Sequence, residues 1–116
     1  MIPVVEEYFS TGGAAAWRDR FVDHAQGLRV IGTEDGEWLS GEAAFAVFAD
    51  PSAHVDPMPS VVLSDLEAYE HGGTGWVACR PLLSLPDGST LTLRWTAVFE
   101  RTGPSWTLRQ LHVSRG

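Results

Sequence analysis

The sequence predicts an α+β domain in which N-terminal helices pack on a curved antiparallel sheet. Apolar residues recur at helical spacing in the first half of the chain and at alternate positions in the second half. Short turns separate four long alternating segments after residue 60, which favours an antiparallel meander. A length of 116 residues suits one domain, so we expect a single domain over residues 1–116.

Two helices are predicted before residue 27. Residues 4–9 carry an apolar stripe at helical spacing, and the Ser-Thr-Gly-Gly sequence at 10–13 ends it. Helical spacing resumes over 14–24, where we expect Trp17 and Phe21 to face inward.

A short strand and a third helix are predicted next. The β-branched run at 28–31 indicates the strand, and the polar, Gly-containing segment 32–37 indicates a loop. Ser40 is a favourable N-cap for a helix over 41–49, whose inner face carries Phe45.

Four strands follow, and their turns are the clearest local signals in the chain. A His-Gly-Gly-Thr sequence and an Asp-Gly pair mark the first two turns, and Gly103-Pro104 marks the third. The strands are predicted over residues 61–70, 76–85, 90–101 and 106–114.

The last strand carries the candidate site. Side chains alternate along a strand, so one face is predicted to carry Trp106, Leu108, Gln110, His112 and Ser114. A face that begins aromatic and becomes polar is typical of a pocket wall. His112 is the strongest candidate for an acid–base role, because histidine changes charge near neutral pH. A purely structural, hydrogen-bonded histidine is the alternative.

Two acidic residues of the first long strand form a second candidate. Alternation places Asp65 and Glu67 on one face, together with Val61, Leu63 and Tyr69. If that face points inward, either carboxylate would be desolvated and suited to act as a general base. If it points outward, both are ordinary solvated groups.

Composition excludes several classes of function. The net charge is −7, and all eight basic residues are arginines scattered along the chain. Nucleic-acid binding needs a basic stripe, and anionic membranes attract basic segments, so neither partner is expected. The absence of lysine excludes Schiff-base chemistry in this chain.

The single cysteine, Cys79, lies in an apolar segment and is expected to be a small buried hydrophobe. No Cys/His spacing fits a zinc site, and no metal or organic cofactor is expected. The N-terminus does not resemble a signal peptide and no segment is long enough to span a membrane, so the expected location is the cytoplasm.

Two short motifs carry a family resemblance. The first is Val30-Ile31-Gly32-Thr33 followed by Glu37-Trp38 and Gly41. The second is the C-terminal set Trp106, Gln110, His112, Ser114 and Gly116. With the order of elements, they make the chain resemble the SnoaL-like superfamily, small SnoaL-like domains of the nuclear transport factor 2-like cone fold.

The resemblance implies a pocket between the inner sheet face and the helices, and a homodimer formed through the outer sheet face. The expected pocket lining is Trp17, Phe21, Trp38, Phe45, Trp95, Gln110 and His112.

The function implied first is binding of a small, largely apolar molecule. One alternative is a cofactor-independent isomerase, cyclase or dehydratase that uses His112 or a buried carboxylate as base, with Gln110 or the Trp38 N–H stabilising an enolate. Another is a dimeric scaffold with a filled cavity.

The Glu37-Trp38 pair has two interpretations. Trp38 could cap a bound ligand while Glu37 accepts a proton or hydrogen bond. Alternatively, Glu37 accepts backbone N–H groups within a turn and Trp38 plugs the core.

Overall fold

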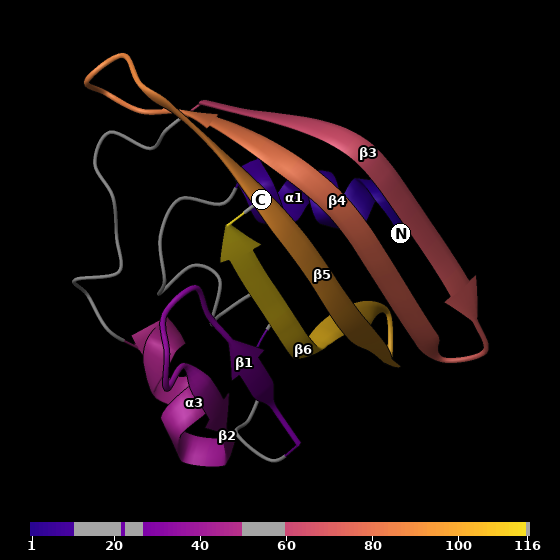
Figure 1. Cartoon of the computed structure of the whole chain (residues 1–116). Coiled ribbons are helices and arrows are strands. Elements are labelled where there is room, and N and C mark those ends of the chain that lie inside the picture. The colour runs from indigo at the N-terminus through magenta and orange to yellow at the C-terminus, as the bar shows by residue number, and fades with distance from the viewer. Residues whose placement is uncertain (11–21, 23–26, 50–59, 116) are drawn as a thin grey trace.

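A strongly curved six-stranded sheet dominates the computed structural model, which describes residues 1–10, 22, 27–49 and 60–115 (Figure 1). The predicted α+β class is confirmed. In chain order the elements are α1 (Ile2–Ser10), β1 (Arg29–Ile31), β2 (Trp38–Ser40), α3 (Gly41–Ala49), β3 (Ser60–His71), β4 (Thr74–Ser84), β5 (Thr90–Thr102) and β6 (Ser105–Arg115).

The sheet order is β2-β1-β6-β5-β4-β3. Strands β3 to β6 form the predicted antiparallel meander. Two further strands extend it, because β1 lies parallel to β6 and β2 lies antiparallel to β1. The sequence prediction missed β2, and the predicted second helix falls almost entirely outside the described residues.

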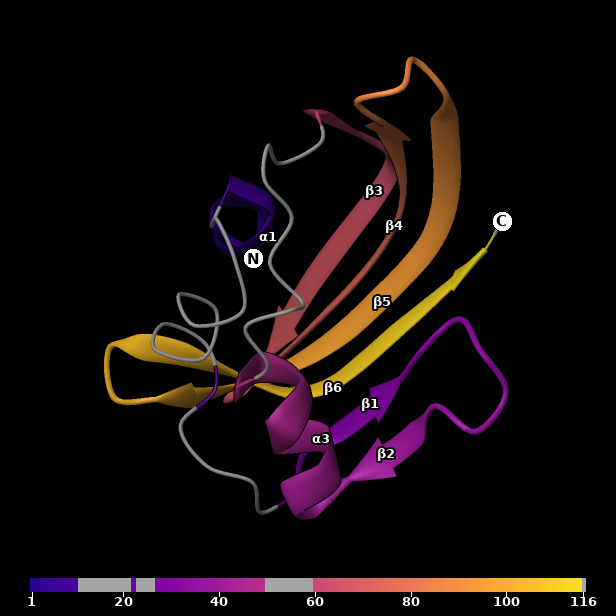
Figure 2. The same cartoon turned by 90° about the vertical axis from the view of Figure 1, so that its left-hand side faces the viewer.

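Helix α1 lies on the concave side of the sheet (Figure 2). Its Val5 is fully buried, and the rings of Phe9 and Trp95 lie 5.0 Å apart between centroids. Helix α3 lies against β1 and β2 and contributes the buried Ala44 to the same core. The described helices are not of the length and apolar character needed to cross a membrane.

The core occupies the concave face. On β4 and β5 alternate residues are buried, including Val77, Cys79, Trp95, Ala97 and Phe99. Full burial of such an apolar side chain stabilises a fold by about 1.5–3 kcal/mol, so this layer is a main source of stability.

Two β-bulges interrupt the strand pairing. In β3 the register shifts between Ser64 and Glu67, and Asp65 there has a φ of 52°. In β6 Val98 pairs with Gln110 but Phe99 pairs with Leu108, which leaves Arg109 as the extra residue. A bulge bends its strand and reverses the faces of the residues beyond it. Both bulges therefore change which side chains reach the concave face.

Candidate functional site

The bulge in β6 divides the site predicted on that strand. Trp106 and Leu108 are buried on the concave side, as are Leu111 and the half-buried Val113 beyond the bulge. Gln110, His112 and Ser114 pair with Val98, Thr96 and Arg94 and lie on the outer face. The prediction that Trp106, Leu108, Gln110, His112 and Ser114 share one face is therefore wrong, because Arg109 shifts the alternation by one residue.

The concave face changes character along the strands. Near α1 it is closely packed, with Val77, Phe99 and Leu108 buried. Towards the opposite end of β3, β4 and β5 the side chains are apolar but only half-buried. These residues form the apolar wall: Val61, Leu63, Leu83, Leu91, Leu93 and Val113.

The apolar wall adjoins two core residues, Trp95 and Cys79. Trp95 is 2% exposed and pairs with Val113 across the sheet. Cys79 lies beside it, since Cys79 pairs with Trp95. Burial raises the pKa of the Cys79 thiol to about 11, so the thiol stays protonated at neutral pH and is no nucleophile.

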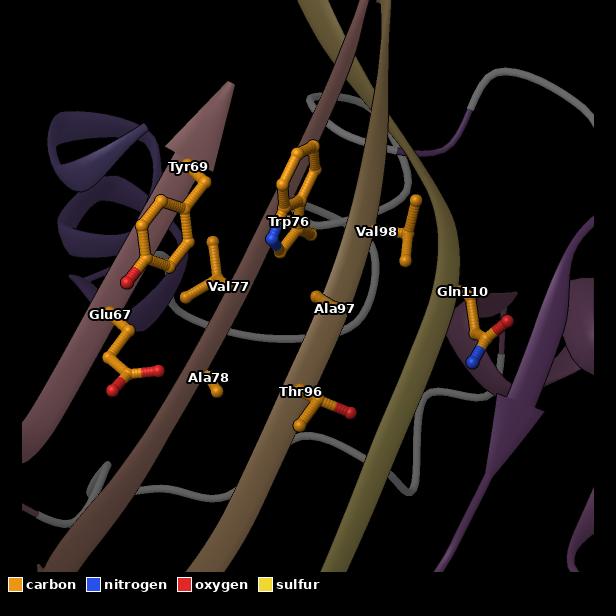
Figure 3. A pocket seen from close by; sticks show the side chains of 9 residues that line it. All are labelled: Glu67, Tyr69, Trp76, Val77, Ala78, Thr96, Ala97, Val98 and Gln110. Carbon is orange, nitrogen blue, oxygen red and sulfur yellow. The ribbon is translucent and has the colours of Figure 1, made fainter. Parts of the chain in front are cut away.

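The outer face holds a separate, open hollow of about 250 Å³ (Figure 3). The residues that line it come from all four long strands: Glu67, Tyr69, Trp76, Val77, Ala78, Thr96, Ala97, Val98 and Gln110. Of these, Val77 and Ala97 have their side chains buried in the core. The rings of Tyr69 and Trp76 stack at 5.9 Å between centroids, although both residues are exposed to solvent. A hollow with exposed stacked aromatics is typical of an interaction surface.

Two ion pairs lie on either side of the outer hollow, which itself contains the carboxylate of Glu67. At one end Arg80 lies 3.6 Å from Asp65, and at the other Arg109 lies 3.1 Å from Glu100. The Arg94 Nε–H donates a hydrogen bond of 3.1 Å to Ser114. Between them, Glu67 forms no ion pair with another described residue.

Asp65 and Glu67 do not form the inward-facing pair considered from the sequence. The bulge in β3 separates them from Val61 and Leu63, which stay on the concave side. Both carboxylates are solvent-exposed. The prediction that these two residues share a face with Val61 and Leu63 is therefore wrong. The alternative, in which both carboxylates are ordinary solvated groups, is the one observed.

The Glu37-Trp38 turn matches the structural interpretation in part. The Glu37 carboxylate accepts a hydrogen bond of 2.8 Å from the Glu34 N–H, and the Gly32 N–H donates to the Glu37 carbonyl. Trp38 does not plug the core: it is 66% exposed, and the Arg29 guanidinium lies 4.7 Å from its ring centroid. An edge position on β2 leaves one face of the ring in solvent.

The predicted pocket lining is thus spread over the molecule. Trp95 lies in the core, Phe45 is half-buried on α3, and Trp38 is exposed on β2. Gln110 and His112 lie on the outer face, so the sheet separates them from Trp95. Trp17 and Phe21 lie outside the described residues. Within the described ranges, no group of three His, Cys, Asp or Glu side chains is arranged to hold a metal ion.

Glu67 and Gln110 were candidates from the sequence, but sequence reasoning did not bring them together with Tyr69, Trp76 and Val98 in the outer hollow. The signal was available for two of them, because the predicted turn at 71–74 fixes the pairing of Tyr69 with Trp76. Trp76 pairs with Val98 through the register of β4 and β5. The place of Gln110 beside Val98 depends on the bulge in β6, for which the sequence carries no comparable signal.

Comparison with protein families decides the identity of this architecture. The model of the SnoaL-like domain matches residues 4–115, nearly the whole chain. The chain belongs to the SnoaL-like domain family. The resemblance noted from the two sequence motifs is thereby confirmed.

Solved structures place this SnoaL-like domain in the nuclear transport factor 2-like fold. A candidate ketosteroid isomerase from Parabacteroides distasonis superposes with a TM-score of 0.81 at 13% identity, covering 99% of this chain and 84% of that one. An NTF2-like protein from Cytophaga hutchinsonii gives 0.60 at 16% identity, covering 89% and 82%. A candidate dehydratase of the NTF2-like family from Streptomyces avermitilis gives 0.54 at 21% identity, covering 77% and 65%.

These similarities establish the fold of the SnoaL-like domain and not its activity, because one fold serves many functions. No curated protein matches this sequence.

Proposed function

We propose that this SnoaL-like domain binds a small, largely apolar molecule against the apolar wall on the concave face of its sheet. The observation that carries the proposal is the half-buried state of six adjoining aliphatic side chains beside a packed core. Apolar surface left in contact with water gains free energy when a ligand covers it, at about 25 cal/mol per Å².

The chemistry of the wall selects the ligand. All six members of the wall are aliphatic, so the wall itself offers a ligand no charged or hydrogen-bonding side chain. Arg115 follows Val113 on that face of β6, pairs with Leu93, and lies 3.9 Å from Glu34. A ligand with an apolar body and at most one polar group near this rim fits the arrangement best.

Binding is favoured over catalysis by the position of the candidate base. His112 lies on the outer face, across the sheet from the apolar wall. The names of the Parabacteroides and Streptomyces proteins, a candidate isomerase and a candidate dehydratase, keep proton-transfer chemistry as the alternative. That alternative needs a base from another part of the chain, so the proposal assigns no reaction.

A matched pair of variants on β3 tests the binding proposal. Leu63 belongs to the apolar wall, and the neighbouring Val62 is 61% exposed on the opposite face. We expect N-phenyl-1-naphthylamine, a neutral fluorescent probe, to bind the wild type. Leu63→Asn should weaken binding about ten-fold, which corresponds to about 1.4 kcal/mol, while Val62→Asn should leave it unchanged.

Circular dichroism of both variants controls for folding. Absence of probe binding to the wild type, or equal losses in the folded Leu63→Asn and Val62→Asn variants, would contradict the proposal. If instead only Leu63→Asn weakens probe binding, assays with small apolar carbonyl compounds are the next step.

We also propose that a second copy of the chain covers the outer sheet face. The middle of that face presents Tyr69, Trp76 and Val98 together with the polar residues Glu67, Thr96 and Gln110, and an ion pair lies on either side of it. Aromatic residues are enriched in the centres of protein interfaces.

The size of the face suits a dimer. Strands β4 and β6 each contain 11 residues. Four strands with a spacing of about 4.8 Å and a rise of about 3.3 Å per residue present a face of roughly 19 by 36 Å, or about 700 Å². A standard interface buries about 800 Å² on each partner.

Two tryptophans provide a matched test of dimer formation. Trp76 is 42% exposed in the centre of the outer face, and Trp38 is 66% exposed on the distant edge strand β2. We expect Trp76→Glu to sediment as a monomer and Trp38→Glu to sediment as a dimer, like the wild type. A monomeric wild type would refute the dimer.

A further inference from the structure

We infer that the ligand of the apolar wall is an aliphatic carboxylate, whose head group binds Arg115 in the place that Glu34 holds in the free protein. This inference rests on the proposed function, because it names the polar group of the molecule bound at the wall. It starts from a row of side chains that crosses the concave face and ends at Arg115.

One row of the concave face leads from the apolar wall to a cation. Leu63 on β3 pairs with Pro81 on β4, and Leu93 on β5 pairs with Arg115 on β6. The flanking pairs of β4 and β5 put Pro81 beside Leu93. Cross-strand neighbours point to the same side of a sheet, so the row passes from apolar side chains to a guanidinium on one face.

The row also sets the length of a ligand that lies along it. It runs from β3 across β4 and β5 to β6. Three strand spacings of about 4.8 Å, or roughly 14 Å in all, therefore separate its two ends. The extended chain of decanoate is of similar length. Such a molecule covers half-buried aliphatic side chains and still places its carboxylate at the Arg115 end.

Arg115 is available to bind this carboxylate. Its guanidinium donates no hydrogen bond to another described residue, and its ion pair with Glu34 is 3.9 Å long. The two side chains are 69% and 71% exposed, so this pair contributes little to stability. A guanidinium has donors but no acceptor, and it binds a carboxylate through two parallel hydrogen bonds.

Glu34 marks the place of the ligand's head group. The turn that follows β1 holds its backbone, because the Glu34 N–H donates to the Glu37 carboxylate and the Glu34 carbonyl accepts from the Glu37 N–H. Its exposed side chain reaches Arg115 at a distance longer than a hydrogen bond. A ligand carboxylate that approaches the guanidinium more closely therefore replaces a weak contact with a stronger one.

Total charge at this rim does not select the ligand, because the same turn carries Asp35 and Glu37 as well as Glu34. The positions of the groups do. The Glu37 carboxylate lies against Gly32 within its own turn, and Asp35 is exposed in the loop. Arg115 continues the row of the wall, so a ligand that lies along this row meets a cation at its end.

Displacement of N-phenyl-1-naphthylamine by decanoate, 1-decanol and decylamine at neutral pH tests the inference. The three ligands share an aliphatic chain and differ in the charge of the head group. We expect Arg115→Gln to weaken decanoate binding about five-fold, to leave 1-decanol binding unchanged and to strengthen decylamine binding. Glu34→Gln should strengthen decanoate binding about two-fold, because it removes the competing carboxylate.

Arg94→Gln is the matched control. Arg94 follows Leu93 on β5 but lies on the outer face, where it donates a hydrogen bond to Ser114. Its loss should leave the binding of all three ligands unchanged, and circular dichroism checks that each variant is folded.

Two kinds of outcome separate the inference from the proposed function. Equal losses of decanoate and 1-decanol binding in Arg115→Gln, or wild-type binding of decylamine as tight as that of decanoate, would overturn the carboxylate and leave binding at the wall intact. A wild type that binds neither the fluorescent probe nor any of the three ligands would overturn the proposed function and the inference together.

Discussion

At the scale of single residues, backbone conformation and burial decide more than residue type. Asp65 is the one non-glycine residue with positive φ in the described part of the chain, and it sits in the bulge of β3. Asp and Asn tolerate this conformation, whereas a β-branched residue is strained in it. The bulge therefore depends on the residue at position 65.

Substitution of Asp65 should show this dependence. We expect Asp65→Val to lower the free energy of unfolding by roughly 1–2 kcal/mol, because a β-branched side chain strains a φ of 52°. Asp65→Gly should be neutral or stabilising, although it also removes the exposed ion pair with Arg80. Urea denaturation measures both. A variant Asp65→Val as stable as Asp65→Gly would show that the strain is absent.

Cys79 should behave as a buried hydrophobe. Its raised pKa of about 11 predicts negligible reaction of the native protein with a thiol reagent at pH 8 and rapid reaction in urea. The folded state also holds this proton more tightly than the unfolded state, so stability is full below about pH 9 and falls as pH rises towards 11, by roughly 2 kcal/mol. Cys79→Ala should remove this part of the loss. Labelling of the native thiol at the unfolded rate would refute the buried site.

The Glu37 carboxylate should be structural. Glu37→Ala removes the acceptor of the Glu34 N–H and should lower stability by about 1 kcal/mol, while Glu37→Gln keeps an acceptor oxygen and should cost less. Thermal unfolding compares the two. If probe binding to the apolar wall changes in Glu37→Gln while stability does not, the turn has a binding role.

At the scale of elements, the bulge at Arg109 matters most. It lets Leu108 and Leu111 both reach the core, although three positions separate them. Strict alternation would have buried Gln110 and His112 and exposed Leu111. The bulge thus preserves the apolar core and moves the polar end of β6 to the outer face.

Deletion variants should reveal whether Arg109 is the extra residue that sets the faces of β6. Removing Arg109 leaves Leu108 and Gln110 on their observed faces and removes the bend of the strand and the contacts of Arg109, the Glu100 ion pair among them. We therefore expect a folded protein destabilised by about 1–2 kcal/mol. Removing Thr96 from the middle of β5 reverses the faces of half that strand and should prevent folding. Equal outcomes for the two deletions in circular dichroism would show that Arg109 is not a removable insertion.

At the scale of the whole molecule, the curved sheet separates two surfaces. The concave face packs on α1 and continues into the apolar wall, and the outer face gathers the aromatic pair and the polar residues of β6 (Figures 2 and 3). The proposed ligand site and the proposed dimer interface therefore lie on opposite faces of one sheet.

The proposed dimer has a thermodynamic consequence. Association stabilises only the folded chain, so the melting temperature of the wild type should rise with protein concentration. Trp76→Glu should melt at a temperature independent of concentration, and Trp38→Glu should follow the wild type. Differential scanning calorimetry over a hundred-fold range of concentration measures this. A constant melting temperature in the wild type, with sedimentation as a monomer, would argue against the dimer.

Much of the fold was predictable from local patterns. The turn sequences and the alternation after residue 60 predicted the four strands of the meander. These features are local, because propensity, turn chemistry and period act over a few residues. The two motifs added the SnoaL-like family, which the match over residues 4–115 confirms.

The candidate site was not predictable in the same way. The faces of His112 and Gln110 depend on a bulge in the pairing of β6 with β5, and those of Asp65 and Glu67 on a bulge in the pairing of β3 with β4. A bulge forms between two strands, so the alternation of either strand alone does not contain it. The parallel pairing of β1 with β6 likewise joins segments far apart in the chain. Local sequence thus specified the elements, and only long-range pairing decided which side chains meet on each face of the sheet, because a shift of one residue exchanges the two faces.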